Sequence, residues 1–197
     1  MKNMRLFILI GAILLVAGAF WLLDFRLAFS NTGTEKLTMT TDMGENNMPI
    51  SMQRKQRLSL VMVGEGALAG ALQKALVKEL EQAGLGEIVL EQDLKPGYPN
   101  PVLVVKVARS VPVWTPIFAM SRLSIHAGYD SGGDTTFMQA VEDTHTSVGK
   151  PDAANMYAEY DVRDRSVGLI SHPGYHRYLA EFLAREIITV LKGMYEA

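Results

Sequence analysis

The chain has 197 residues, of which 48% are apolar and 20% charged, and it contains no cysteine. This apolar share is too high for a disordered chain, and the length allows one domain with additional segments. The formal net charge of −2 argues against nucleic-acid binding through bulk charge. The lack of cysteine excludes disulfides, thiolate metal sites, a cysteine nucleophile and lipidation on a cysteine.

Residues 1–29 are predicted to form an N-terminal transmembrane anchor or a signal sequence. Lys2 and Arg5 precede the uninterrupted apolar run Leu6–Leu23, whose 18 residues would extend about 27 Å as a helix, close to the thickness of the bilayer core. Basic residues before the run predict a cytoplasmic N-terminus, with the rest of the chain outside, in the periplasm or the extracellular space. We therefore expect a single-pass protein of the cytoplasmic membrane.

A cleaved signal peptide is the alternative interpretation of the same segment. Ala17-Gly18-Ala19 and Ala28-Phe29-Ser30 both have the small-x-small form of a cleavage site. The apolar run continues past the first site, and Arg26 lies just before the second, so an uncleaved anchor is favoured. Cleavage would make the protein secreted, and either alternative exports the remainder of the chain.

Residues 30–57 are predicted to be a polar linker. This segment is rich in threonine, asparagine and glycine, with at most a short edge strand at Lys36–Met39. The extracytoplasmic domain then covers residues 58–197.

The domain begins with a strand, a helix and a second strand. Leu58–Val63 is a short apolar run typical of a buried strand. Leucines at every fourth position predict an amphipathic helix over Ala67–Ala83, and Gly84 is a suitable C-terminal stop. Glu87–Glu91 is predicted to be the second strand.

Further strands are predicted at Val102–Val107, Phe118–Tyr129 and Met156–Val162, the last two with clear alternation of apolar and polar residues. Pro112 and Pro116 place the stretch between them at a sheet edge or a bulged turn.

The end of the chain is predicted to turn and then form a helix. Asp164-Arg165 is interpreted as a turn that leads into Ser166–Ile170. Pro173 then begins a final helix that extends to about Tyr195.

This β-α-β-β-β-β-α order predicts an α+β fold, a two-layer sandwich in which two long helices cover one face of a mostly antiparallel sheet. The layout from Leu58 to Tyr195 resembles that of envelope-assembly lipoproteins, of the lipopolysaccharide-assembly lipoprotein type. Their lipidated cysteine is missing here, so a protein anchor would have to replace the lipid. The resemblance implies a non-enzymatic envelope protein of binding or assembly type.

Three sets of residues are candidates for a site. Gly64, Gly66 and Glu91 have the order of a dinucleotide-binding fingerprint, although glycines at a tight strand-to-helix turn explain the pattern more simply. His172 and His176 have a spacing that can present two imidazoles to a metal, but the sequence nominates no third ligand.

The third candidate set is aromatic. Trp114 lies between two prolines, with Phe118 after it and Tyr98 before the strand, and such residues on an exposed edge could contact a partner. The alternative is that they close one end of the core.

The sequence contains no hydrolase motif and no phosphate-binding loop of the Walker type, and we expect no cofactor. The leading hypothesis is therefore a membrane-attached protein that binds a protein partner or an amphiphilic ligand through a sheet edge or the groove between its helices. A metal-handling domain at His172 and His176 is the second hypothesis, and dinucleotide binding at Gly64–Ala69 is the third.

Overall fold

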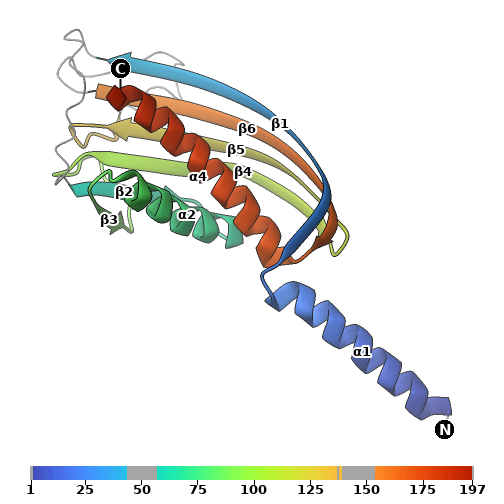
Figure 1. The fold of residues 1–197 in the computed structure, drawn as a ribbon. Helices are drawn as coiled ribbons and strands as arrows, with labels where there is room; N and C mark the ends of the chain where they lie inside the picture. The colour runs from blue at the N-terminus through green and yellow to red at the C-terminus, as the bar shows by residue number, and fades with distance from the viewer. Residues whose placement is uncertain (1, 44–56, 137, 139–153, 197) are drawn as a thin grey trace.

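The structure, a computed structural model, describes residues 2–43, 57–136, 138 and 154–196. Its helices and strands follow the chain in the order α1 (Lys2–Leu22), β1 (Arg26–Met43), β2 (Arg57–Val63), α2 (Ala67–Ala83), β3 (Glu87–Glu91), β4 (Val102–Thr115), β5 (Phe118–Asp130), β6 (Ala154–Ile170) and α4 (His172–Glu196). Figure 1 shows α1 extending from one end of a body in which α2 and α4 lie on the same face of a curved sheet. The predicted α+β class is confirmed.

The sheet is mixed, which corrects the expectation of a mostly antiparallel one. Its strand order is β1-β6-β5-β4-β2-β3. β2 is parallel to both of its neighbours, β3 and β4, whereas β4, β5, β6 and β1 pair in antiparallel fashion. Helix α2 crosses over the sheet between β2 and β3, and such a crossover leaves the two strands parallel.

The main core lies between the sheet and the two helices. Leu72, Leu76 and Leu80 of α2 are fully buried there, as the four-residue spacing predicts. From β6, the alternating residues Met156, Ala158, Tyr160 and Val162 point into the same core. The face of the sheet that carries these residues is therefore closed by helices.

Strand β1 corrects the predicted linker. Residues 30–43 belong to this long edge strand, which begins at Arg26 and pairs with β6 along its whole length. Residues 44–56 of the predicted linker lie outside the described part of the chain. Pairing with β6 supplies the backbone of this polar segment with hydrogen bonds, and tertiary context of this kind overrides a composition typical of loops.

Strand β6 is continuous through Asp164-Arg165, where the sequence predicted a turn. The strand pairs with β5 on one side and β1 on the other across this point, where Asp164 lies opposite Ser121 and Gly33. Alternation also continues, so the Asp164 side chain points inward and is 6% exposed. A strand paired on both sides has no reason to turn there.

Strand β4 extends past Pro112 to Thr115, with a bulge between Val107 and Arg109. The pairing of β4 with β2 ends at Lys106. At Pro112, β4 pairs with β5 on one side, and among the described residues its other side is an edge of the sheet. The edge position predicted from the two prolines is confirmed.

Helix α1 contacts the body at its C-terminal end, where Trp21 lies against Trp114 and His172. Around the rest of the helix, most apolar side chains are exposed to solvent, including Phe7 (72%) and Leu15 (75%). Within the described residues, no helix combines the length and the apolar character that a membrane span requires, so the structure lends no support to the single-pass expectation for Leu6–Leu23.

Candidate functional site

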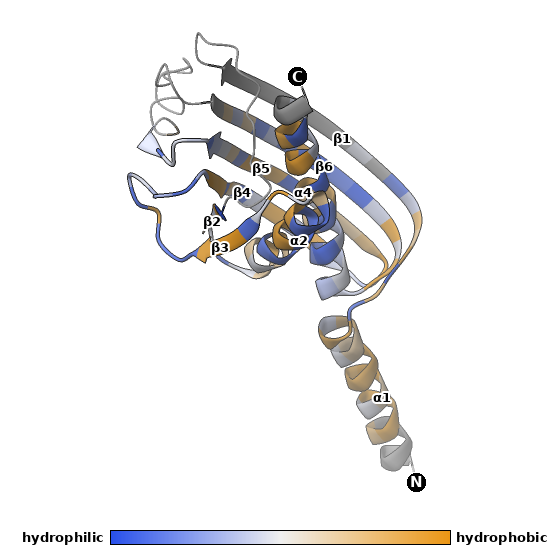
Figure 2. Cartoon of the chain, turned by 60° about the vertical axis from the view of Figure 1, so that its left-hand side comes forward, coloured by the Kyte–Doolittle hydropathy of each residue, from blue (hydrophilic) through white to orange (hydrophobic). Residues whose placement is uncertain are grey.

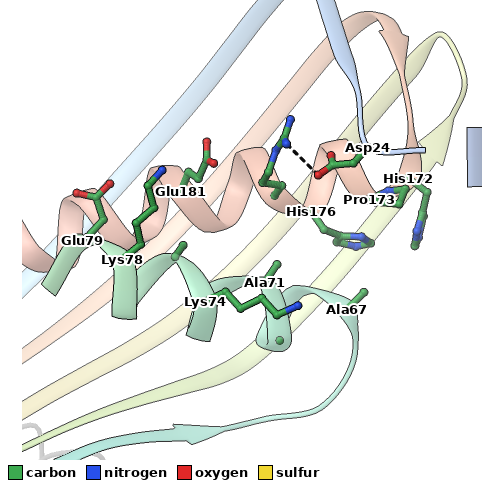
Figure 3. Close-up of a pocket in the computed structure, with 13 residues that line it drawn as sticks. Asp24, Ala67, Ala71, Lys74, Lys78, Glu79, His172, Pro173, His176 and Glu181 are labelled. Atoms are coloured by element: carbon green, nitrogen blue, oxygen red, sulfur yellow. Dashed lines mark ion pairs between the residues drawn. The ribbon is translucent and has the colours of Figure 1, made fainter. Parts of the chain in front are cut away.

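A groove of about 470 Å³ lies between α2 and α4, near the end of the body from which α1 extends. Small residues on α2 leave the space, since Ala67, Gly70, Ala71 and Ala75 line this wall. His172, Pro173 and His176 from the first turns of α4 line the opposite wall, as Figure 3 shows. The groove is thus a mostly apolar slot between two helices.

Charged groups of both signs border this groove. Lys74, Lys78 and Glu79 come from α2, and Glu181 comes from α4. Arg177 forms an ion pair with Asp24, with 2.9 Å between its guanidinium nitrogen and the carboxylate oxygen. This pair ties the segment after α1 to α4, although an ion pair this exposed adds little stability.

Four rings form a cluster where α1, β4 and α4 meet. The Trp21 ring stacks on His172 with 4.5 Å between the ring centroids, and Trp114 approaches His172 edge-on at 5.5 Å. His176 packs against His172 at 4.4 Å. Both tryptophans of the chain therefore contact His172, which in turn contacts His176, and the two histidines line the groove.

Burial favours the neutral form of both histidines. It lowers the pKa of His172 below the usual 6.5. It also lowers the pKa of His176, where the neighbouring His172 acts in the same direction and the backbone carbonyl of His172 opposes it. His176 is 7% exposed, and its Nδ1 has no well-formed hydrogen bond within the described residues.

The described part of the chain offers the metal hypothesis no third ligand. Both histidines are helical, since α4 begins at His172, one residue before the predicted start. Among the described residues, no group of three histidine, cysteine, aspartate or glutamate side chains is placed to hold a metal ion. Asp24, an acid in the groove lining, is paired with Arg177.

The glycines of the dinucleotide hypothesis form the turn between β2 and α2. Gly64 and Gly66 adopt positive φ angles of 141° and 94°. A Cβ atom at Gly64 would lie 3.0 Å from that of Val107, so close packing accounts for this glycine. Glu91 ends β3 and pairs with Lys95, and none of these residues lines the groove.

The structure separates the three aromatic candidates. Trp114 and Phe118 flank the turn between β4 and β5, but the Trp114 ring faces inward and its Nε1 donates a hydrogen bond to the Ile170 carbonyl at 3.1 Å. Tyr98 is buried at 8% exposure, in a second apolar cluster on the opposite face of the sheet. Its hydroxyl donates to the Asp93 carbonyl and accepts from the Lys95 backbone.

A buried polar network around Asp164 went unpredicted. One carboxylate oxygen accepts hydrogen bonds from Tyr175 at 2.9 Å and Ser166 at 3.1 Å, and the other accepts one from Tyr178 at 3.3 Å. Burial raises the pKa of both tyrosines, so the two hydroxyls remain donors. The alternation of β6 already placed Asp164 in phase with Val162 on the inward face, and this signal could have found it.

No protein-family model matches the chain, and no curated protein matches it either. The structure is similar to the PelC dodecamer from Paraburkholderia phytofirmans, with 9% identity and a TM-score of 0.41, over 77% of this chain and 96% of that one. It is also similar to a minor lipoprotein from Acinetobacter baumannii, with 14% identity and a TM-score of 0.32, over 70% and 93% of the two chains. Identities and TM-scores this low carry no information about the function of this chain.

Proposed function

We propose that this chain is a membrane-attached envelope protein that acts by binding, and that an amphiphilic ligand occupies the groove between α2 and α4. The observation that carries the proposal is the groove itself, a mostly apolar space of about 470 Å³ that opens beside an exposed apolar helix. Sites for small molecules commonly enclose roughly 300–1,000 Å³ with mostly apolar walls and a few polar groups.

The lining of the groove supports a ligand with an apolar chain and a polar head. Ala67, Gly70 and Ala71 offer no polar side chain, so the α2 wall favours hydrocarbon. Lys74, Lys78 and Glu181 border the same space, where a polar head can form charge-assisted hydrogen bonds. The neutral forms of the two histidines keep this end of the groove compatible with an apolar chain.

The exposure of α1 supports attachment to a membrane. Phe7, Leu14 and Leu15 are each at least two-thirds exposed, and apolar side chains surround the helix. A helix that is hydrophobic on all sides needs an apolar environment, which the body does not supply. We infer that lipid supplies it, and that the basic residues Lys2 and Arg5 remain in the cytoplasm.

Alkaline extraction of cell membranes tests the attachment. The full chain should stay in the membrane pellet, and release into the soluble fraction would contradict the proposal. Because the chain lacks cysteine, Lys192→Cys introduces a single thiol on an exposed position of α4. A membrane-impermeant maleimide should label it in spheroplasts without lysis if the body lies outside.

Photo-crosslinking tests the ligand. The full chain in liposomes is exposed to a single-chain fatty acid that carries a diazirine, and mass spectrometry locates the label. We expect label on α1 from the bilayer and on residues 67–78 and 172–181 from the groove. Label confined to α1 would contradict groove binding and leave membrane attachment standing.

A matched pair of glycine variants controls this experiment. Gly70→Leu projects a side chain into the groove, and the position has no heavy atom within 4 Å to obstruct it. Gly193→Leu makes the same change in α4, also with nothing within 4 Å and outside the groove lining. Gly70→Leu should remove the groove label and keep the α1 label, whereas Gly193→Leu should change neither.

A further inference from the structure

The outer face of the sheet, opposite the helices, carries three arginines from three adjacent strands. They surround a shallow hollow of about 420 Å³, with Arg109 from β4, Arg122 from β5 and Arg163 from β6. Arg122 and Arg163 are direct cross-strand partners. Arg109 lies opposite Ser124, two residues further along β5. Strand pairing therefore gathers three guanidinium groups on one surface.

This arrangement leaves positive charge unbalanced. Within the described residues, none of the three arginines forms an ion pair or a side-chain hydrogen bond. Among the described residues that line the hollow, Asp161 is the one carboxylate, against three guanidinium groups. Like charges directly opposite each other on neighbouring strands are destabilising, so the arrangement favours an anionic ligand that neutralises them.

Toward α1 the same outer face becomes mostly apolar, with Arg165 of β6 opposite Met120 as a charged exception. Val113 of β4 pairs with Met120 of β5, and their side chains are 43% and 39% exposed. On the next strands, Val167 and Leu169 of β6 are 38% and 41% exposed, and Leu27 of β1, opposite Leu169, is 61% exposed. Figure 2 shows apolar residues where the long strands bend toward α1 and hydrophilic residues further along them. We call these five residues the apolar tip.

The spacing of the two regions matches the depth of a lipid headgroup layer. Met120 and Arg122 are two residues apart on β5, which is about 7 Å along a strand. The headgroup region of one leaflet is roughly 5–7.5 Å deep, which is half of the difference between a total thickness of about 40–45 Å and a hydrocarbon core of about 30 Å. If the apolar tip lies at the edge of the hydrocarbon core, the three arginines therefore lie at the depth of the lipid phosphates.

We propose that this outer face docks on the membrane surface, and that Arg109, Arg122 and Arg163 bind the phosphates of anionic phospholipid headgroups. Guanidinium groups suit this ligand because their planar donors match phosphate oxygens. The inference rests on the membrane attachment proposed above, and it adds a lipid specificity on a surface that the groove does not share.

A fluorophore at the apolar tip tests the docking. Val113→Cys gives the full chain a single thiol for an environment-sensitive nitrobenzoxadiazole label. The labelled chain is reconstituted in vesicles of phosphatidylcholine with or without 30% phosphatidylglycerol. We expect severalfold brighter emission with phosphatidylglycerol, and the difference should disappear in high salt. Equal emission from the label in the two kinds of vesicle would overturn the inference.

Two triple variants of equal charge control the result. Arg109→Gln, Arg122→Gln and Arg163→Gln together should abolish the dependence on phosphatidylglycerol. Arg57→Gln, Arg185→Gln and Lys192→Gln together remove the same charge elsewhere and should retain it. Loss of the dependence in both variants would show that net charge alone is responsible, and the arginine site would be refuted.

Two further outcomes separate the possible failures. Flotation of the vesicles on a density gradient measures whether the chain is bound to them. A chain that floats with neither kind of vesicle refutes the membrane attachment, and the docking with it. A chain that floats with both but shows no preference refutes the docking alone. Inorganic phosphate added to pure phosphatidylcholine vesicles should not reproduce the signal, and if it does, the arginines bind a free anion and the docking proposal fails.

Discussion

Helices α4 and α1 contain similar apolar residues, but only α4 buries them. In α4, Leu179, Leu183 and Ile187 recur along one stripe and are at most 1% exposed. In α1 the apolar residues are consecutive, and the side chains of Phe7, Leu14 and Leu15 remain exposed. A stripe can be covered by a sheet, whereas a helix that is apolar on all sides cannot be covered by one neighbour. Periodicity therefore separates the helix that makes the core from the helix that needs another environment.

Removing a buried leucine from α4 should have the largest effect on stability. Leu183→Ala, at a fully buried position, should lower the free energy of unfolding by about 2–5 kcal/mol, because the cavity cannot be filled by neighbours. Leu15→Ala, at 75% exposure, should leave the stability of the body nearly unchanged. Urea unfolding of the two variants in the same detergent checks the difference, and equal losses would contradict the comparison.

Removing the buried carboxylate of Asp164 should have the next largest effect. Asp164→Ala leaves the hydroxyls of Tyr175 and Tyr178 without their acceptor, which should cost about 2–3 kcal/mol of unfolding free energy. Tyr175→Phe removes one donor and should cost less, about 1–2 kcal/mol. If Asp164→Ala is no less stable than the wild type in urea unfolding, the network does not hold α4 against β6.

Acidification should lower the stability of the folded protein. The pKa values of His172 and His176 are lowered in the folded protein, so the unfolded chain binds more protons below its own value of about 6.5. The stability that these histidines contribute is therefore present above pH 6.5 and falls as the pH drops below it. Urea midpoints at pH 7.5 and 5.0 should show this loss, and a variant with His172→Gln and His176→Gln should show less of it.

The smallest stability effect is expected at the apolar tip. Met120→Ser changes a side chain that is 39% exposed on the outer face, and the free energy of unfolding should change by at most about 0.5 kcal/mol. The same variant should reduce the emission of the Val113→Cys label on anionic vesicles. A stability loss as large as that of Leu183→Ala would show that the tip belongs to the core.

The helices and most strands could be predicted because their signals are local. The buried faces of α2 and β6 were predicted correctly, from the spacing of Leu72, Leu76 and Leu80 and from the alternation between Met156 and Val162. The long strand β1 was missed because its polar residues match a linker, and its pairing with β6 is a contact between segments more than a hundred residues apart. The turn predicted at Asp164 was wrong for a similar reason, since pairing with partners on both sides keeps that strand continuous.

Of the candidate site, the sequence indicated a groove between two helices and, as a separate hypothesis, the pair His172 and His176. Only the structure places these histidines in the groove lining. The sequence did not indicate that Trp21 and Trp114 would join them, because three elements distant in the sequence meet there. Nor did it indicate the arginine surface, in which each strand contributes a single residue. A lone arginine on the polar face of a strand has no distinguishing pattern until its neighbours in the sheet are known.

The amino-acid sequence alone determined the α+β class, the amphipathic helices and the uninterrupted apolar run Leu6–Leu23. These depend on the spacing of residues within a few turns or pleats, which local geometry sets. The tertiary structure decided the strand order, the inward position of Asp164, the width of the groove and the gathering of Arg109, Arg122 and Arg163. Those features depend on the register between segments distant in the chain, which no local pattern specifies.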